Sequence, residues 1–338
     1  MRTAVLAYSG GLDTSCAIAW LKEDYGFHEV VAVLVDVGQD TDFEPAIACG
    51  RAAGADDIIL LDCKDEFAEE QVAKALVANA LYEGKYPLIS ALSRPVIAAA
   101  VAGVAVELDA EAVVHGCTGK GNDQVRFELA FKASYPGVKV IAPLRDRVWT
   151  RDEEIAYARA RGIPVEAKPE SPYSIDDNLF GRAIEAGVLE DPWAAPPEEA
   201  FALTASPAGS RAPTDLVLGF ESGLPVSVDG EELELADLVA VLNEQAGGYG
   251  IGRIDMIENR VVGIKSRELY EAPAALTLIA AHQALEDLVL TRPSSSPNGS
   301  WSRSGRASST RASGSARRAR PTTRSSPRRR SSSTARSG

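Results

Sequence analysis

The chain has 338 residues, 45% of them apolar, which is enough for two modest domains or one large one with a substantial core. It has no uninterrupted apolar run of roughly eighteen residues and no basic, then apolar, leader, so we expect no membrane span, no secretion and a cytoplasmic location. Its net charge is −13, but 11 arginines and no acidic residue follow position 292, which leaves 24 basic against 48 acidic residues before it and disfavours nucleic-acid binding by that part.

A glycine-containing turn between a strand and a helix comes first along the chain. Thr3–Ala7 is an apolar run of strand length, and Ala17–Lys22 carries the apolar stripe of a helix. The residues between them, Ala7–Ser15, read Ala-Tyr-Ser-Gly-Gly-Leu-Asp-Thr-Ser. Such a turn presents unpaired N–H groups and a positive helix end to an anion, and its glycines allow a phosphate to approach the backbone. We therefore predict nucleotide binding here rather than an ordinary turn.

Asp13 is the acidic residue of this loop, and a carboxylate is a poor direct ligand for phosphate. Two roles stay open for it: a cap for the following helix, or a hold on Mg²⁺ that neutralises the phosphates. The loop resembles the pyrophosphate loop of the ATP-pyrophosphatase enzymes, which adenylate a substrate oxygen. It is not a Walker loop, because no Gly-Lys-Ser/Thr follows at the required spacing.

The next segments alternate between strand and helix patterns. Val30–Val37 is a continuous apolar run typical of a fully buried strand, residues 43–53 read as a helix, and Asp57–Leu61 as another strand. This alternation predicts an α/β fold with a doubly wound parallel sheet, whose ligands bind beyond the carboxyl ends of the strands. A long Ala/Val helix is expected to begin near Arg94 and Pro95, with Pro95 in its first turn.

A second dense motif, His115–Glu128, follows the predicted strand Ala112–Val114. It belongs at the same edge of the sheet as Ala7–Ser15. Thr118, Asn122 and Asp123 offer a hydroxyl, an amide and a carboxylate for the charged ends of an amino acid, and Arg126 offers a planar fork for a carboxylate or phosphate. We assign no chemistry to His115, because a lone histidine at a strand end is usually a packed, hydrogen-bonded residue.

The composition and the pattern of the sequence change near residue 170. Thr150 is expected to cap a helix that runs to Arg161, and prolines, short alternating segments and the glycine-rich stretch Gly247–Arg253 then follow. We predict a nucleotide-binding α/β domain over residues 1–169, a substrate-binding α+β domain over residues 170–292, and a disordered Arg/Ser-rich tail over residues 293–338. The four cysteines lack metal-ligand spacing, so no dedicated metal site is expected beyond Mg²⁺ carried with a nucleotide.

Several separated motifs together resemble the argininosuccinate synthase family. They are Ala7–Ser15, Tyr86–Leu88, His115–Glu128, Tyr173–Leu179, Leu189–Trp193 and Gly250–Arg267. The resemblance implies a homotetrameric ligase of arginine biosynthesis. It would join L-citrulline to L-aspartate with ATP, through a citrullyl-AMP intermediate, and release AMP and pyrophosphate.

The resemblance also implies roles for individual residues. The ATP-binding positions are Ala7, Tyr8, Ser9, Gly10, Gly11, Leu12, Asp13, Thr14, Ser15, Val35 and Gly116. The aspartate-binding positions are Thr118, Asn122 and Asp123, and the citrulline-binding positions are Tyr86, Asn122, Arg126, Ser174, Glu258 and Tyr270. Asp13 and Asp123 are the candidate catalytic residues.

The sequence departs from the commoner family pattern at several positions. Ala91 and Ala183 stand where many members have citrulline-contacting serines, Val35 replaces a small residue, and Glu268 and Ala274 replace glycines on either side of Tyr270. These changes affect the expected citrulline contacts, not the expected class of reaction.

The tail after residue 292 replaces sequence that the family normally has, so we expect it to be the product of a shifted reading frame and to weaken tetramer formation. A genuine basic extension is the alternative. Two other functions remain to be weighed. A tRNA-thiolating ATP-pyrophosphatase would need a catalytic cysteine pair and a basic face. An RNA-associated protein acting through its arginine-rich tail would have no use for substrate motifs.

Overall fold

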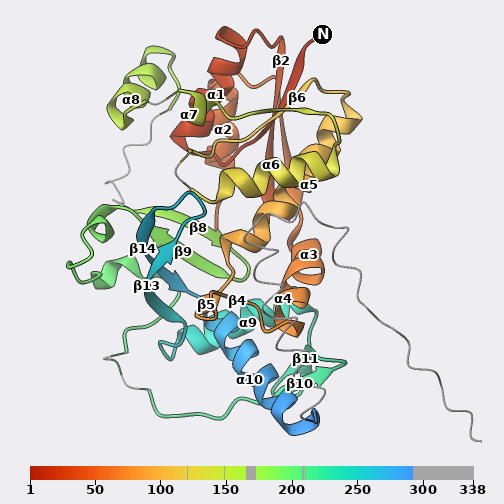
Figure 1. Cartoon of the computed structure of the whole chain (residues 1–338), viewed down its shortest axis with the longest axis vertical. Helices are drawn as coiled ribbons and strands as arrows, with labels where there is room; N and C mark the ends of the chain where they lie inside the picture. The colour runs from red at the N-terminus through yellow and green to blue at the C-terminus, as the bar shows by residue number, and fades with distance from the viewer. Residues whose placement is uncertain (120, 148, 165–172, 208, 210, 292–338) are drawn as a thin grey trace, which may run out of the picture.

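The computed structural model describes residues 1–119, 121–147, 149–164, 173–207, 209 and 211–291. The predicted tail, residues 293–338, and the predicted boundary near residue 170 lie outside these ranges. In Figure 1, a sheet flanked by helices forms the upper part of the molecule, and antiparallel strands with two long helices form the lower part.

A five-stranded parallel sheet organises the first part of the chain, with the strand order β3-β2-β1-β6-β7. Its strands are β1 (Thr3–Ala7), β2 (Glu29–Asp36), β3 (Asp57–Asp62), β6 (Ala112–Val114) and β7 (Lys139–Ile141). Alternate residues of these strands enter two separate apolar clusters: Val5 and Val33 belong to one, Leu6 and Leu34 to the other. A sheet buried on both faces explains the continuous apolar runs of the sequence, and the predicted α/β class is confirmed.

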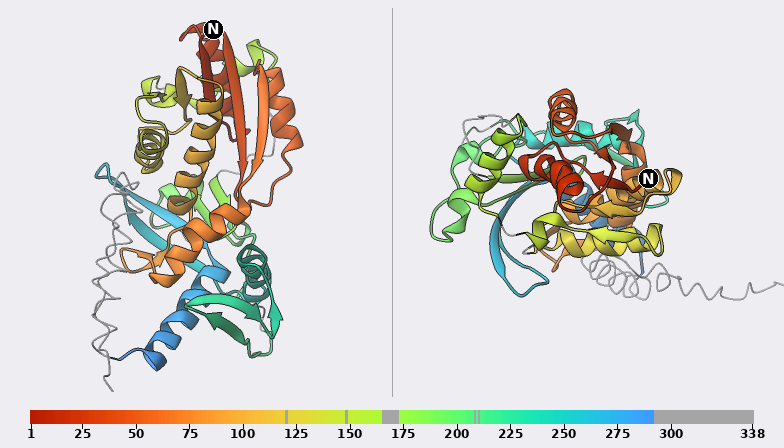
Figure 2. Two further views of the ribbon diagram at one scale, coloured as in Figure 1. Left: turned by 90° about the vertical axis from the view of Figure 1, so that its right-hand side faces the viewer. Right: turned by 90° about the horizontal axis from the view of Figure 1, so that it is seen from above.

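Helices cover both faces of this sheet (Figure 2). They are α1 (Leu12–Glu23), α2 (Glu44–Ala52), α5 (Ser90–Glu107), α6 (Asp123–Ser134), α7 (Pro143–Asp146) and α8 (Arg151–Ala160). Helices α5 and α6 pack on the face of Val5, whereas α1, α2, α7 and α8 pack on the face of Leu6. The predicted cap of α8 is confirmed, because Thr150 and Glu153 form a reciprocal capping box.

Helix α5 differs from its prediction at the start. It begins at Ser90, so Pro95 lies inside the helix rather than in its first turn. It is also long and apolar enough, by length and composition, to cross a membrane, and it is the single described helix with that property. Half of it is buried inside this fold, and it packs along α6 and β1, as the core helix of a globular domain does.

The second part of the chain is α+β, as predicted. An antiparallel sheet in the order β13-β14-β9-β8 contains β8 (Ser174–Asn178), β9 (Gly181–Glu185), β13 (Arg253–Asn259) and β14 (Lys265–Glu271). A second sheet contains β10 (Leu218–Glu221), β11 (Leu224–Val228) and β12 (Glu231–Glu232). The helical elements are η2 (Gly187–Glu190), η3 (Glu198–Ala200), α9 (Leu235–Gly247) and α10 (Pro273–Val289).

One segment of the first part packs against the second. It contains α3 (Lys64–Phe67), the π-helical turn η1 (Ala68–Val72), α4 (Ala73–Val77) and the short strands β4 (Leu81–Tyr82) and β5 (Tyr86–Pro87). Figure 1 shows α3 and α4 beside α9 and α10; α3 contacts α9, and α4 contacts α10. Because this segment packs against the second part, Tyr86 lies next to β13 and β14, which are far from it in sequence.

Candidate active site

The loop after β1 has the geometry of an anion site. Gly11 is the N-cap of α1, and no side chain in the described part of the chain caps this helix, so the N–H groups of its first turn are available to a ligand. Gly10 has a φ of +78°, and a Cβ there would lie 2.5 Å from the Cβ of Ala46. Only glycine therefore allows this loop to fold. The Ser15 side chain is buried and donates to the Gly11 carbonyl over 2.8 Å, and its backbone N–H donates to the same carbonyl over 3.0 Å.

Asp13 occupies the second position of α1 and is not its cap, so the capping alternative is wrong. Its carboxylate lies 3.3 Å from the guanidinium of Arg151, at the start of α8, and its side chain is 43% exposed. Glu154 lies on the same helix. Burial and the charge of Asp13 raise the pKa of Glu154 to about 8. Glu154 is therefore mostly neutral at pH 7, and it is buried, whereas the Asp13 carboxylate is exposed.

The loop after β6 lies directly beside the first. A Cβ on Gly116 would lie 2.5 Å from the Thr14 side chain, so the glycine allows the two loops to touch. Asn122 caps α6, and Asp123 is its first residue. His115 is buried and stacks on Phe127, and burial lowers the pKa of its imidazole to about 4. His115 is therefore a neutral, packed residue, as the sequence predicted.

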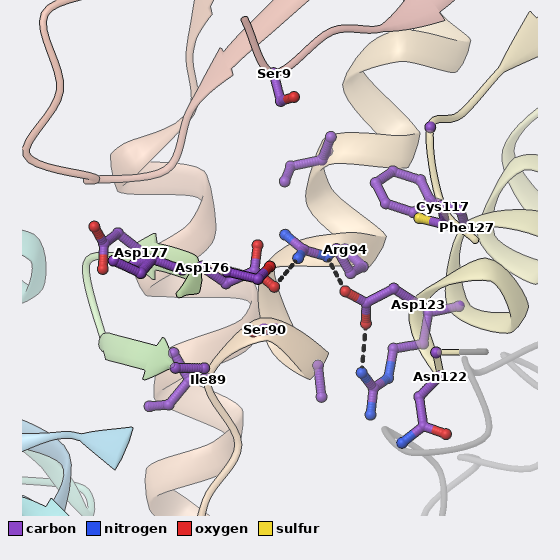
Figure 3. A pocket seen from close by; sticks show the side chains of 18 of the residues that line it. Ser9, Ile89, Ser90, Arg94, Cys117, Asn122, Asp123, Phe127, Asp176 and Asp177 are labelled. Carbon is purple, nitrogen blue, oxygen red and sulfur yellow. Dashed lines mark hydrogen bonds and ion pairs between the residues drawn. The ribbon is translucent and has the colours of Figure 1, made fainter. Parts of the chain in front are cut away.

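An ion-pair network joins this loop to α5 and β8. Arg94 donates from Nε to Asp123 over 2.7 Å, and its Nη2 lies 2.5 Å from Asp176 (Figure 3). Arg126 Nη1 lies 2.5 Å from the other oxygen of Asp123. Burial opposes ionisation of Asp123, but the two guanidinium groups outweigh it and lower the pKa of Asp123 to about 2. Asp123 is thus a permanently charged anchor between two arginines.

Arg126 retains an unused donor. Its side chain is 7% exposed, and its buried Nε has no hydrogen-bond partner among the described residues. A buried donor without a partner is costly, so this atom is a position where a ligand oxygen would be stabilised.

A second polar cluster surrounds Glu258 on β13. Its Oε2 accepts from Tyr86 Oη at 2.6 Å and lies 2.7 Å from Tyr270 Oη, while its Oε1 accepts from Asn122 Nδ2 at 3.0 Å. The rings of Tyr86 and Tyr270 stack with centroids 4.6 Å apart. Burial and the neighbouring charge of Glu268 raise the pKa of Glu258 to about 7. The cluster connects both parts of the chain at a single carboxyl group.

The two loops, the ion-pair network and the Glu258 cluster all contribute residues to the lining of one cavity of about 560 Å³. The predicted residues that line it are Ala7, Tyr8, Ser9, Asp13, Thr14, Val35, Tyr86, Gly116, Thr118, Asn122, Asp123, Arg126, Ser174, Glu258 and Tyr270. The cavity lies beyond the carboxyl ends of β1 and β6. The strand order reverses between these two neighbouring strands, because β2 and β3 lie on one side of β1 whereas β6 and β7 lie on the other.

Comparison with known proteins gives the family. Residues 3–164 match the family described as "Arginosuccinate synthase N-terminal HUP domain", and residues 173–298 match "Arginosuccinate synthase C-terminal domain". The chain belongs to the argininosuccinate synthases. These are ATP-dependent ligases of arginine biosynthesis, and their HUP-type nucleotide-binding domain is the parallel sheet described above.

Individual argininosuccinate synthases match most of the chain. The protein of Streptococcus agalactiae serotype V is 54% identical over 289 residues, which span 85% of this chain and 72% of the relative. The Bacillus licheniformis protein is 54% identical and the Bacillus velezensis protein 55% identical, each over 292 residues, 86% of this chain and 72% of the relative.

Four predicted ATP-binding residues do not line the cavity: Gly10, Gly11, Leu12 and Ser15. They build the loop and the first turn of α1. Ala91 and Ala183, which replace the commoner serines of argininosuccinate synthases, do line it. Their methyl groups offer no hydrogen bond.

Sequence reasoning missed several charged residues that line the cavity, namely Arg94, Asp176, Glu185, Arg260 and Glu268. Arg94 left a signal, because it is the only charged residue of α5 before its last position. A lone arginine in an apolar core helix needs a buried partner, and that partner is Asp123. Glu268 was noticed as a departure, but its contact with Tyr270 could not be read from the sequence.

Proposed function

We propose that the loop Ala7–Ser15 holds the phosphates of ATP, with Val35 and Gly116 beside the adenosine. The N–H groups at the start of α1, which no described side chain caps, support this assignment, because Ser9, Asp13 and Thr14 beside them line the cavity. The loop stabilises the negative charge of pyrophosphate as it leaves, which is where preorganised backbone donors accelerate such a reaction.

Asp13 suits a magnesium ion carried with ATP. Among the described residues no group of three or more His, Cys, Asp or Glu could hold a metal by itself. One exposed carboxylate beside a phosphate site is the donor set with which proteins usually bind Mg²⁺, the remaining ligands being phosphate oxygens and water. The bound ion would neutralise phosphate charge, and Asp13 would hold it at the first turn of α1.

Citrulline occupies the side of the cavity formed by Tyr86, Asn122, Arg126, Ser174, Glu258 and Tyr270. The unused Nε of Arg126 is the observation that carries this assignment, since a substrate carboxylate would complete the guanidinium fork. The ureido oxygen then bonds to the α-phosphorus, and pyrophosphate leaves with the electrons of the broken P–O bond. The product is citrullyl-AMP.

Aspartate binds at Thr118, Asn122 and Asp123, at the start of α6. Its uncharged amine attacks the ureido carbon of citrullyl-AMP, AMP leaves, and a proton is lost from the new C–N link. Asp123 takes part as a fixed charge and not as a base, because a carboxyl with a pKa of about 2 has little tendency to accept a proton. Catalysis comes from positioning and electrostatics, without a covalent enzyme intermediate.

Three further proposals concern the whole protein. Residues 1–169 form the nucleotide-binding domain and residues 170–292 the substrate-binding domain. The protein is a homotetramer in the cytoplasm, and the tail of residues 293–338 weakens its assembly.

Pyrophosphate release that requires both amino acids tests the reaction. Purified protein should release pyrophosphate and AMP continuously only when citrulline, aspartate and ATP are all present. Release that depends on tRNA instead would support the thiolating alternative. Binding of bulk RNA without any turnover would support the RNA-associated one.

A further inference from the structure

Two carboxyl groups meet at one hydroxyl in the citrulline side of the cavity. Tyr270 Oη lies 2.7 Å from Oε2 of Glu258 and 2.7 Å from Oε2 of Glu268. The strand geometry explains the arrangement: Glu268 and Tyr270 are two residues apart on β14, so they share a face of the sheet, and β13 brings Glu258 to the same face.

Hydrogen-bond counting shows that this arrangement needs an additional proton. The Tyr270 hydroxyl has one hydrogen and can donate to only one of the two carboxyls. The other contact, at the same short distance, requires a carboxyl that donates to the tyrosine oxygen. Tyr86 cannot supply that proton, because its own hydroxyl hydrogen points to Glu258 at 2.6 Å.

The surroundings favour Glu258 as the carboxyl that carries the proton. Glu268 Oε1 accepts from Ser266 Oγ at 2.7 Å and from Arg260 Nη2 at 3.2 Å, so a cation stabilises its ionised form. Arg260 also pairs with Glu185 on β9. Among the described residues Glu258 forms no ion pair, and its hydrogen bonds are to the neutral side chains of Tyr86, Tyr270 and Asn122. Two further titratable groups interact electrostatically with Glu258 without a hydrogen bond to it: Tyr82 on β4 and the guanidinium of Arg260.

We infer that Glu268 is a positioning residue for the amino-acid substrate: it shares one proton with Glu258 before citrulline binds, and the citrulline ammonium displaces that proton. This inference rests on the proposed citrulline site. The ammonium is the cationic group of citrulline, and only a cation has reason to bind between two carboxylates. The proton goes to solvent, and the two charges then face one ammonium and Arg260.

Burial and the charge of Glu268 raise the pKa of Glu258 to about 7. The displacement of the proton by the citrulline ammonium should therefore be measurable at pH values near 7. Below that pH the pair holds its proton, and citrulline must compete with it. Above it, the proton is already lost. Citrulline should therefore bind about tenfold more weakly at pH 6 than at pH 8.

Calorimetric titration of citrulline tests the inference. The protein is first saturated with Mg²⁺ and α,β-methylene ATP, whose α–β bridge cannot be cleaved, and each titration is repeated in buffers of different ionisation enthalpy. We expect release of about 0.5 to 1 proton per citrulline at pH 6.5 and little at pH 8.5. Binding without proton release at pH 6.5 overturns the inference and leaves the proposed function intact. Failure to bind citrulline in every buffer overturns the proposed function itself.

Glu268→Gln and Glu268→Gly separate positioning from a structural role. Both should still bind citrulline, but proton release at pH 6.5 and the tenfold pH dependence should both become smaller, because burial alone then raises the pKa of Glu258. Glu185→Gln is the matched control, since it removes a nearby charge that does not touch Tyr270, and it should keep the proton release. Unchanged release in both Glu268 variants would contradict the inference.

Discussion

Arg94 holds Asp123 by a 2.7 Å bond from Nε to Oδ2, and the same guanidinium reaches Asp176 on the other part of the chain. This contact fixes the start of α6 against α5 and β8, and with it the predicted aspartate site. It also explains why Asp123 is a poor base: both of its oxygens already accept from arginines.

Arg94→Lys should lower kcat/KM for aspartate by about tenfold to a hundredfold, because an ammonium cannot span both aspartates in the geometry of a guanidinium. Initial rates of AMP release with aspartate varied would measure this. Arg161→Lys is the matched control, since Arg161 pairs with Glu23 outside the cavity and its loss should leave the rate unchanged. An equal loss in both variants would contradict a specific role for Arg94.

Asp13→Ala should reduce pyrophosphate release by at least about tenfold to a thousandfold, the range for removing one preorganised electrostatic group. Glu154→Gln provides the comparison. Glu154 has a pKa of about 8 and is mostly neutral at pH 7, so a neutral amide should replace it with little effect on the rate. Near-normal turnover in Asp13→Ala would remove this carboxylate from the mechanism, and a shifted dependence on Mg²⁺ concentration would connect it to the ion.

Asp123→Ala should weaken aspartate more than citrulline, and Arg126→Lys should weaken citrulline more than aspartate. The first removes a carboxylate that can pair with the aspartate ammonium, and the second removes the fork with the unused Nε. Because the two side chains lie 2.5 Å apart, the double variant should lose less than the sum of the single losses in free energy. Steady-state kinetics with each substrate varied decides, and equal effects on both substrates would show that the division of the loop is wrong.

The sequence was sufficient for the sheet and for the strand–turn–helix geometry of Ala7–Ser15, because both depend on local patterns. Buried parallel strands read as continuous apolar runs, and this turn is one contiguous segment. It was insufficient where the chemistry comes from distant strands. Glu258 and Glu268 meet at Tyr270 only through the pairing of β13 with β14, and Arg94 meets Asp176 only across the two parts.

Two local predictions also failed for physical reasons. Asp13 was a plausible cap by residue type, but the helix starts at Leu12 and takes Gly11 as its cap. Pro95 was expected in a first helical turn, yet α5 begins at Ser90 and accommodates the proline further along. Helix ends depend on tertiary packing, which residue preference alone does not determine.

Glu271 is expected to be the most sensitive structural position outside the cavity. Its fully buried carboxylate accepts from the backbone N–H groups of residues 202–204, from the Thr204 hydroxyl and from Arg182. Glu271→Ala would leave the backbone and hydroxyl donors buried without their acceptor, and among the described residues Arg182 would keep only its ion pair with Asp177. We expect the free energy of unfolding to fall by about 3 to 5 kcal/mol.

Urea unfolding followed by circular dichroism measures this loss, with Glu231→Ala as the control at an exposed strand position. The control should change the free energy of unfolding by about 0.5 kcal/mol or less. Glu271→Gln is informative as well, because its amide oxygen can still accept from the backbone but cannot balance Arg182. Its free energy of unfolding should lie between those of the wild type and Glu271→Ala. A stable Glu271→Ala protein would mean that water replaces the carboxylate, and the segment of residues 202–204 would then not depend on it.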